Sequence, residues 1–449
     1  MKKKLVALLL AVIMVLALSA CSSSPDDKTG QNTQITDTKS PGSDAPDQGN
    51  EQITINLWHS FIDEDDGNRI ATEEFIAAYT AEHKNVKVEQ HILEDSSFKD
   101  KLLTEFSGSA QNVDVFNYWG AGRAGDLVNA GKLLCIEDYL DPDEVSLIKE
   151  GADNNFRYGG KLYAAPLASW MLVLYCNTEI FEANGIKLPT TYDEWLEACK
   201  KLSAAGILPL ALGGGVDDGW LAAFVYEGLA NRTVGSVEEM NVLNSLNGFA
   251  DNLGFREAAE KMIELNKAGA FGNSPLEIDE VTATAQFLTG AAAMALEGTW
   301  YTNGIYESED SAVEGKIKAV PFPMVTGGKG KTTDYMGGFI DGVFVNKNVK
   351  NPDVVADFAW SYALFLSTHQ HETGEGFTPY NTDVDESGLY PLGRELAELA
   401  NTLTDGVIAW DTLLPGDLAD IHIDACQALL QVNANVDSFI EDHLAIFDQ

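Results

Sequence analysis

Indole rings and carboxylates recur directly after strand-like apolar segments of this chain. The residues in such positions are Trp58, His59, Glu94, Tyr118, Trp119, Asp218, Trp220, Glu297 and Trp300. Flat aromatic faces stack on the C–H surfaces of sugar rings, and carboxylates pair with hydroxyl groups. Two carboxyl groups at a suitable separation could instead hydrolyse a glycosidic bond. These side-chain types therefore indicate carbohydrate chemistry, by binding or by cleavage.

Alternating strand and helix patterns must position these residues. Strands are predicted over 53–57, 86–93, 113–116, 172–175, 207–212 and 292–296. Amphipathic helices are predicted between them, and one of these helices opens with a capping-box pattern from Thr191 to Glu194. The order predicts an α/β fold with two lobes, each a mainly parallel sheet flanked by helices. Ligands of such sheets bind beyond the carboxyl ends of the strands.

The N-terminal segment has the pattern of an export signal. Lys2, Lys3 and Lys4 precede a short apolar run, and Ser19 and Ala20 then lead to Cys21. This ending resembles the lipobox of bacterial lipoproteins, in which the cysteine is lipidated and becomes the new N-terminus. The sequence predicts a signal peptide over 1–20 and a lipidated Cys21 with a disordered polar linker over 21–52. A plain secreted protein with an incidental Cys21 is the alternative.

The chain is strongly acidic, with 69 Asp and Glu against 29 Lys and Arg and a formal net charge of −40. Such a surface repels nucleic acid and anionic lipid, so nucleic-acid binding is excluded and the membrane is reached through the lipid anchor only. Exported cysteines can pair, and the pairing of the remaining four is left open. Their apolar neighbourhoods favour buried thiols; these cysteines are Cys135, Cys176, Cys199 and Cys426.

Several motifs occur in an order that resembles one known family. They are residues 158–166 with 172–181 (G-K-x-Y-x-x-P … L-x-Y-N-x-x-x-F), 189–194 (P-x-T-W-D-E, with Tyr192 for Trp), 287–300 (F-x-x-G-x-A-A-M … G-x-W) and 321–323 with 337–338. Together they resemble the extracellular solute-binding proteins of carbohydrate ABC importers, the group to which maltose-binding protein belongs. Cys176 departs from the family, which usually has an aromatic residue there.

The resemblance implies two lobes whose chain crosses between them more than once. The crossings are expected near Pro166, Pro321 and Phe377. The first lobe then comprises 53–166 and 321–376, and the second comprises 167–320 and 377–449. Closure around a sugar would present a composite surface to the membrane permease.

The resemblance also implies a receptor that is not an enzyme. It would bind a sugar, expected to be an oligosaccharide, between the lobes, without cofactor or metal, and work as a monomer with ABC permease subunits at the outer face of the membrane. The expected ligand-binding residues are Trp58, His59, Glu94, Tyr118, Trp119, Trp170, Asp218, Trp220, Glu297, Trp300, Phe339 and Asp341. A surface glycoside hydrolase with paired carboxylates is the alternative function. Which sugar binds, whether it is neutral or acidic, and whether a peptide binds instead are left open.

Three further motifs have simpler interpretations. Residues 120–125 match G-x-G-x-x-G, but they follow the third strand, so we expect a tight turn there, in which Arg123 could still meet an anionic substituent of a sugar. The acidic run 63–66 is interpreted as a helix start, although calcium binding is left open. The sequence His-Gln-His-Glu at 369–372 is interpreted as a solvated helix end and not a metal site.

Overall fold

The computed structural model describes residues 52–64, 66–215, 219–235, 237–240, 249, 251–308 and 311–447. The predicted signal peptide, Cys21 and the linker up to residue 51 lie outside the described residues, as does Asp218. The chain from Glu51 to Gln449 forms one compact unit, which contains both lobes.

The strands follow the predicted order, and their bounds differ from the sequence pattern by a few residues or, for β6, by more. They are β1 Ile53–His59, β2 Val86–Ile92, β3 Val115–Trp119, β4 Arg157–Tyr158, β5 Lys161–Leu162, β6 Ala164–Asn177, β7 Leu208–Ala211, β8 Ala292–Gly298, β9 Ile317–Pro321, β10 Asp334–Val345 and β11 Asp405–Val407. β6 is buried at all 14 of its residues, which fits its nearly continuous apolar sequence.

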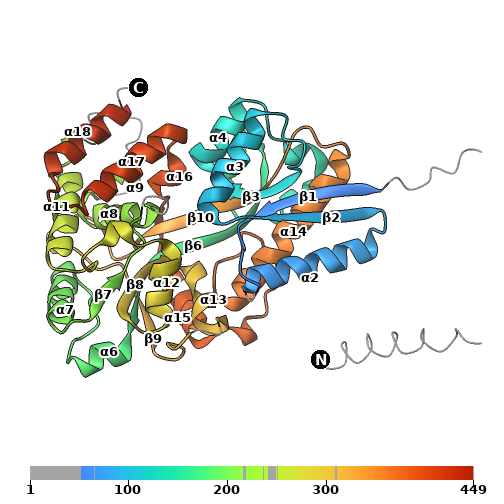
Figure 1. Ribbon diagram of the computed structural model, residues 1–449. Coiled ribbons are helices and arrows are strands. Elements are labelled where there is room, and N and C mark those ends of the chain that lie inside the picture. Colours follow the sequence, from blue (N-terminus) through green and yellow to red (C-terminus); the bar gives the residue numbers. More distant parts are fainter. Residues whose placement is uncertain are drawn as a thin grey trace, which may run out of the picture. The chain divides into compact units, whose positions relative to one another are not determined.

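Helices cover both faces of the sheet in each lobe. In the first lobe α2 and α14 lie on one side of the strands and α3 and α4 on the other (Figure 1). The helices are α2 Gly67–Glu82, α3 Asp95–Ser107, α4 Ala121–Asn129, α5 Pro142–Val145, α6 Thr178–Ala183, α7 Tyr192–Ala204, α8 Trp220–Thr233, α9 Val237–Met240, α11 Leu253–Lys267, α12 Glu280–Leu288, α13 Thr302–Glu307, α14 Pro352–Thr373, α15 Pro391–Ala400, α16 Trp410–Leu413, α17 Gly416–Ala428 and α18 Val436–Phe447. Within the described residues, none of them has both the length and the apolar composition needed to span a bilayer.

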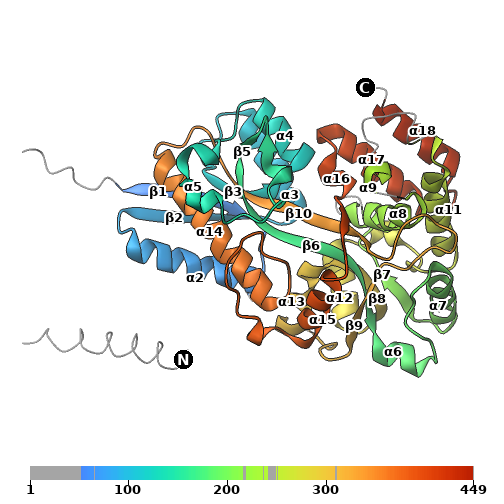
Figure 2. The same cartoon turned by 180° about the vertical axis from the view of Figure 1, so that it is seen from behind.

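The predicted two-lobed α/β fold is confirmed, and its sheet is mixed. The strand order is β2-β1-β3-β10-β6-β8-β7, with β9 beside β6 and β11 beside β10. The pairs β1–β2, β1–β3 and β7–β8 are parallel, as expected for an alternating α/β sequence. The two long strands β6 and β10 pair antiparallel with each other, β6 also with β8 and β9, and β10 also with β3, whereas β11 is parallel to β10. β6 and β10 run from one lobe into the other (Figure 2).

The positions of the crossings between the lobes stay a prediction. Packing shows which core holds the neighbouring segments: Leu167 packs in the first core and Trp170 in the second. Phe322 and Ile340 pack in the second core, and Tyr380 is buried in the first.

Local contacts confirm the predicted helix start at Thr191. The Thr191 side chain accepts a hydrogen bond from the backbone N of Glu194 at 3.3 Å, and the Glu194 carboxylate accepts one from the backbone N of Thr191 at 3.2 Å. These bonds satisfy two of the amides that a helix start leaves free. The four cysteines of the described part are free thiols, and three of them, Cys176, Cys199 and Cys426, are buried.

We expect Gly337→Ala in β10 to destabilise the protein more than Gly160→Ala. Both glycines have positive φ, 139° and 82°, so alanine is strained at either site. A Cβ at 337 would also lie 2.1 Å from the Trp170 carbonyl oxygen, whereas one at 160 meets nothing within 4 Å. Urea unfolding should show a loss of about 1 kcal/mol for Gly160→Ala and about 3 kcal/mol or more for Gly337→Ala. Equal losses would contradict a close approach of β10 to β6.

Candidate ligand-binding site

Four aromatic side chains gather where β6 and β8 meet the first turn of α8. We call Trp170, Trp220, Phe224 and Trp300 the indole group, after its three tryptophans. Trp170 stacks on Phe224 with ring centroids 5.5 Å apart, and Trp300 lies edge-on to Trp170 at 4.9 Å. Trp220 lies 4.9 Å from Phe224 and 6.2 Å from Trp300. Trp170 and Phe224 are buried, whereas Trp220 and Trp300 keep part of their surface exposed.

Local sequence explains how these rings meet. Trp220 and Phe224 are four residues apart on α8, so they share one face of the helix. Trp300 follows β8 on the 3-10 helix Thr299–Tyr301 and folds back over Gly298. A Cβ at Gly298 would lie 2.0 Å from the Trp300 ring, so only glycine lets the ring lie there. Phe224 was not among the residues that the sequence indicated, since it lies inside a uniformly apolar helix.

Glu297 is buried beside the indole group at the end of β8, with 5% of its surface exposed. Burial raises the pKa of its carboxyl group well above the usual value, the nearby Glu280 raises it further, and a hydrogen bond with the Trp300 side chain opposes the shift. Its Oε2 atom and the Nε1 atom of Trp220 are buried without a hydrogen-bond partner among the described residues. Both are polar atoms that a bound hydroxyl group would satisfy.

A second group of predicted residues lies on the strands that join the lobes. Trp119 at the end of β3 pairs with Asp341 of β10, and Phe339 pairs with Ser169 of β6. Gly338 in turn pairs with Trp170, so the same ladder connects Trp119 with the indole group. Trp119 packs against both cores, and the ammonium group of Lys99 lies 4.7 Å above its ring.

Three predicted residues lie instead in the core of the first lobe. Trp58 is 2% exposed, and its Nε1 donates to the Asn112 carbonyl oxygen at 2.6 Å while its ring stacks on His91. His59 is fully buried, and its Nε2 lies 2.9 Å from the Gln90 side-chain oxygen. Tyr118 packs among aromatic residues of the same core. The structure does not bring these three side chains to the indole group.

Glu94 has a structural contact in the first lobe. Its carboxylate accepts a hydrogen bond from the backbone N of Ser97 at 3.3 Å, at the start of α3. A carboxylate in this position satisfies a free helix amide and interacts favourably with the helix dipole.

The G-x-G-x-x-G motif forms a contact between the lobes. Arg123 of α4 donates from Nε to the Asp411 carbonyl oxygen of α16 at 2.7 Å. A Cβ at Gly122 would lie 2.2 Å from the Leu413 carbonyl oxygen, so the glycine permits this close approach. Ala121 adopts φ 49°, and the Tyr158 hydroxyl donates to its carbonyl oxygen at 2.8 Å. The expected tight turn is thus the start of a helix that touches the other lobe.

The structure groups no metal-binding set among the described residues. The end of α14 is less solvated than the sequence indicated: Glu375 is buried, and its carboxylate accepts from Asn68 Nδ2 at 2.6 Å. His371 accepts from the backbone N of Thr378 through Nδ1. Asp66 of the acidic run caps α2 by accepting from the backbone N of Arg69 at 3.0 Å, as the sequence predicted.

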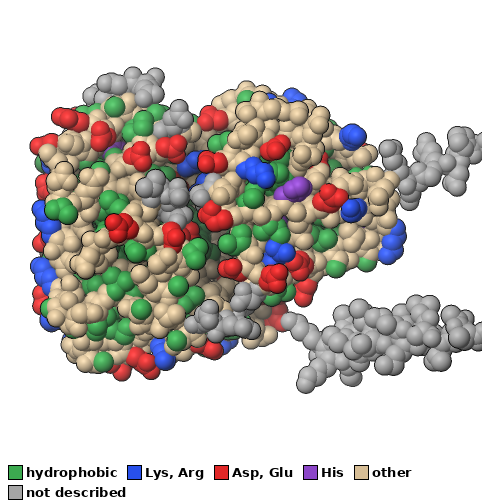
Figure 3. Space-filling view, in the orientation of Figure 1, with side chains coloured by type: hydrophobic (Ala, Val, Ile, Leu, Met, Phe, Trp, Pro, Cys, Tyr) green, Lys and Arg blue, Asp and Glu red, His purple; other side chains and the backbone are tan. Residues whose placement is uncertain are grey.

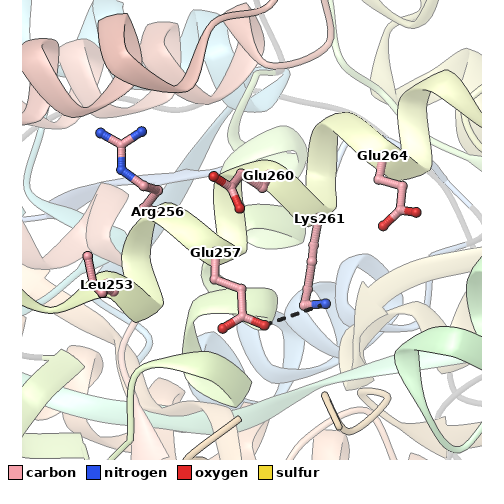
Figure 4. A pocket seen from close by; sticks show the side chains of 6 residues that line it. All are labelled: Leu253, Arg256, Glu257, Glu260, Lys261 and Glu264. Atoms are coloured by element: carbon pink, nitrogen blue, oxygen red, sulfur yellow. Dashed lines mark ion pairs between the residues drawn. The ribbon is translucent and has the colours of Figure 1, made fainter. Parts of the chain in front are cut away.

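Two hollows of the surface differ in the side chains that border them. Figure 3 shows the surface indented between the two lobes, with acidic side chains on both borders. A hollow on α11 is lined by the side chains of one charged helix face: Leu253, Arg256, Glu257, Glu260, Lys261 and Glu264 (Figure 4). There Lys261 pairs with Glu257 at 3.6 Å, and no aromatic residue is among the described residues that line the hollow. The α11 hollow is therefore a solvated helix face and lacks the features of a sugar site.

A profile of the bacterial extracellular solute-binding proteins matches residues 64–371. The chain belongs to this family. A solved structure from a study of xylan utilization by the thermophilic bacterium Caldanaerobius polysaccharolyticus is 31% identical with a TM-score of 0.81, covering 88% of this chain and 99% of that one. A chitin oligosaccharide binding protein shares the fold at 24% identity and a TM-score of 0.77, over 88% of this chain and 98% of its own.

Relatives found by sequence comparison share less identity with this chain than the 31% identical structure does. An uncharacterized ABC transporter extracellular-binding protein of Pyrococcus horikoshii is 22% identical over 258 residues, which is 56% of this chain. The match spans 57% of that protein's length. The family and the fold are therefore established for this solute-binding protein, and its own ligand must be argued from its site.

We expect the stability of the wild type to depend on pH through His59. Burial lowers the pKa of His59 to about 4, opposed by the hydrogen bond with Gln90. In the unfolded chain the same imidazole takes up a proton near pH 6.5, so the folded state binds fewer protons between pH 6.5 and 4. Stability from this group is present above pH 6.5 and falls below it, by up to about 1.4 kcal/mol per pH unit.

Urea unfolding of the wild type and of His59→Asn at pH 7, 6 and 5 measures this effect. The wild type should lose stability relative to His59→Asn as the pH falls, because asparagine does not titrate. His83→Asn, at the half-buried histidine that stacks on Tyr79, is the matched control. Parallel pH profiles for the wild type and His59→Asn would contradict a neutral His59.

Proposed function

We propose that this protein is a lipid-anchored receptor that captures an oligosaccharide between its lobes and delivers it to an ABC permease. The observation that carries the proposal is the indole group, two of whose rings are partly exposed beside unpartnered polar atoms. Trp119 of β3 and its partner Asp341, three residues beyond Gly338 on β10, supply matching side-chain types from the first lobe. Aromatic faces and hydroxyl partners on both sides suit a flat ligand rich in hydroxyl groups.

The similar structures support a sugar chain as the ligand. One comes from a study of xylan utilization and another binds chitin oligosaccharides. The net charge of −40 disfavours an acidic sugar, because its carboxylate would be repelled. We therefore propose a neutral oligosaccharide over a uronic acid.

We propose binding without cleavage. Hydrolysis needs two carboxyl groups about 5 to 9.5 Å apart on either side of the glycosidic bond. Glu297 is buried and hydrogen-bonded to the Trp300 side chain, and Glu94 accepts from a helix amide in the first lobe. Asp341 lies on β10 beside Trp119. These positions support hydrogen bonding to hydroxyl groups better than acid–base catalysis.

A thermal-shift screen of residues 51–449, which contain both cores, tests the proposal. We expect a xylo-, chito- or malto-oligosaccharide to raise the melting temperature, because a ligand that binds only the folded state stabilises it. Trp220→Ala and Trp300→Ala should each weaken the binding of that sugar about tenfold or more, as expected for central aromatic contacts. Tyr139→Ala, at an exposed ring of the first lobe, is the control and should bind normally.

Two results would count against this proposal. If no sugar stabilises the protein while a peptide library does, the ligand class is wrong. If chromatography of the incubated sugar shows shorter products, the glycoside hydrolase is the better function.

We also propose that Cys21 carries the lipid anchor. The full chain expressed in bacteria should partition into the detergent phase of Triton X-114, because two acyl chains give stable membrane attachment. Cys21→Ala should move to the aqueous phase, while Cys135→Ala, at a cysteine of the folded part, should behave as the wild type. Aqueous partitioning of the wild type would indicate a plain secreted protein.

A further inference from the structure

The buried polar atoms near the end of β8 are unusual for a folded core. Four residues of this region have side-chain atoms that are buried without a partner among the described residues: Trp220, Glu297, Thr299 and Asn303. Buried polar groups are normally hydrogen-bonded, so such a group of exceptions requires a ligand or ordered water. The Trp300 side chain bonds Glu297 and lies beside Trp170 and Trp220, which places the carboxyl group at the edge of the Trp300 ring, next to the indole group.

Among the described residues, no cation compensates the Glu297 carboxyl group. The ionisable groups that act on it are Glu280 at the start of α12, Tyr175 of β6 and Tyr301 of the 3-10 helix after β8. Tyr175 bonds the Gly298 carbonyl oxygen at 3.2 Å and Tyr301 bonds the Thr284 carbonyl oxygen at 3.4 Å, so both hydroxyl groups are occupied. A buried carboxylate without a cation is costly, and the group is neutral instead.

The other elements that pack on β8 add no compensating charge. β7, Leu208–Ala211, carries only apolar side chains and a proline. On α8, Glu227 bonds the backbone N of Trp410 at 3.0 Å, and Arg232 donates to the Phe322 and Asp334 carbonyl oxygens at 3.1 and 2.7 Å. Glu297 is therefore a carboxylic acid that keeps its proton at neutral pH, and it can donate a hydrogen bond as well as accept one.

We propose that Glu297 is the specificity residue of the second lobe, a neutral carboxyl group that hydrogen-bonds the sugar ring lying on the indole group. A hydroxyl group of the same sugar ring would accept a hydrogen bond from Nε1 of Trp220. The subsite would therefore select an uncharged sugar that offers both a hydrogen-bond acceptor and a donor. The acidic chain disfavours a uronic acid, because Glu280 and the net charge of −40 would repel its carboxylate. This inference rests on the proposed function and extends it to the residue that selects the sugar.

The neutral state is tested without any ligand. Unfolding of the wild type and of Glu297→Gln is followed from pH 4 to 8, with Glu182→Gln, at an exposed residue of α6, as the control. Above pH 4.5, the usual pKa of glutamate, the unfolded wild type loses a proton that the folded state keeps. Stability from this group is complete below pH 4.5 and falls as the pH rises. The unfolding constant of the wild type should therefore rise relative to Glu297→Gln by up to about tenfold per pH unit.

Sugar contact is tested by calorimetry at pH 7 with xylotetraose, chitotetraose, maltotetraose and galacturonic acid oligomers. Glu297→Gln, an isostere of the neutral acid, should bind the preferred sugar within about threefold of the wild type, whereas Glu297→Leu should bind about tenfold more weakly. A constant stability difference across pH overturns the neutral state. Unchanged affinity in Glu297→Leu overturns the specificity role while the receptor function stands. If the wild type binds none of the sugars, the receptor function and this inference both fail.

Discussion

The paired strands β6 and β10 are the constraint on which the rest of the structure depends. Both strands run from one core into the other, and the register of their pairing fixes which side chains meet between the lobes. Trp119 pairs with Asp341, and Trp170 pairs with Gly338 three residues away on the same strand. A slip of one residue would turn every side chain of β10 to the other face. The close approach of Gly337 to the Trp170 carbonyl oxygen opposes such a slip, because no other residue fits there.

A buried chain of hydrogen bonds fixes α8, the helix that carries Trp220 and Phe224 of the indole group. It runs from Glu227 of α8 through His422 and His443 to the Phe439 carbonyl oxygen, with distances of 2.9, 2.8 and 2.9 Å. Since the carbonyl oxygen only accepts, each link is satisfied when both histidines and Glu227 are neutral. Burial lowers the pKa of His422 to about 4 and raises that of Glu227, which agrees with this assignment. The chain holds α17 and α18 on the helix that begins with Trp220.

The sequence predicted the fold better than the site. Periodicity identified the strands and the Thr191 helix start, because alternation reports burial directly. It ended β1 at residue 57, whereas the strand continues to His59, so Trp58 and His59 are core residues of the strand and not part of a loop beyond it. Phe224 gave no signal, since an apolar residue in a buried helix looks the same whether or not a ligand lies beside it. Side-chain direction at a strand end depends on neighbours that are distant in sequence.

The contact between α4 and α16 limits how the lobes can move. Its hydrogen bond ends on a backbone carbonyl oxygen, and its packing depends on the missing side chain of Gly122. Such a contact has little freedom to slide, because both sides are backbone at close range. β6 and β10 are equally restricted in translation, since each is paired along most of its length. Rotation of one lobe relative to the other is not restricted in this way. Gly337 and Gly338, both with φ of 139°, lie on β10 where such a rotation would change the backbone dihedral angles. Any rotation of one lobe against the other would therefore pivot about the ladder that carries Trp170 and Asp341, and it would change the distance across the site while keeping its register.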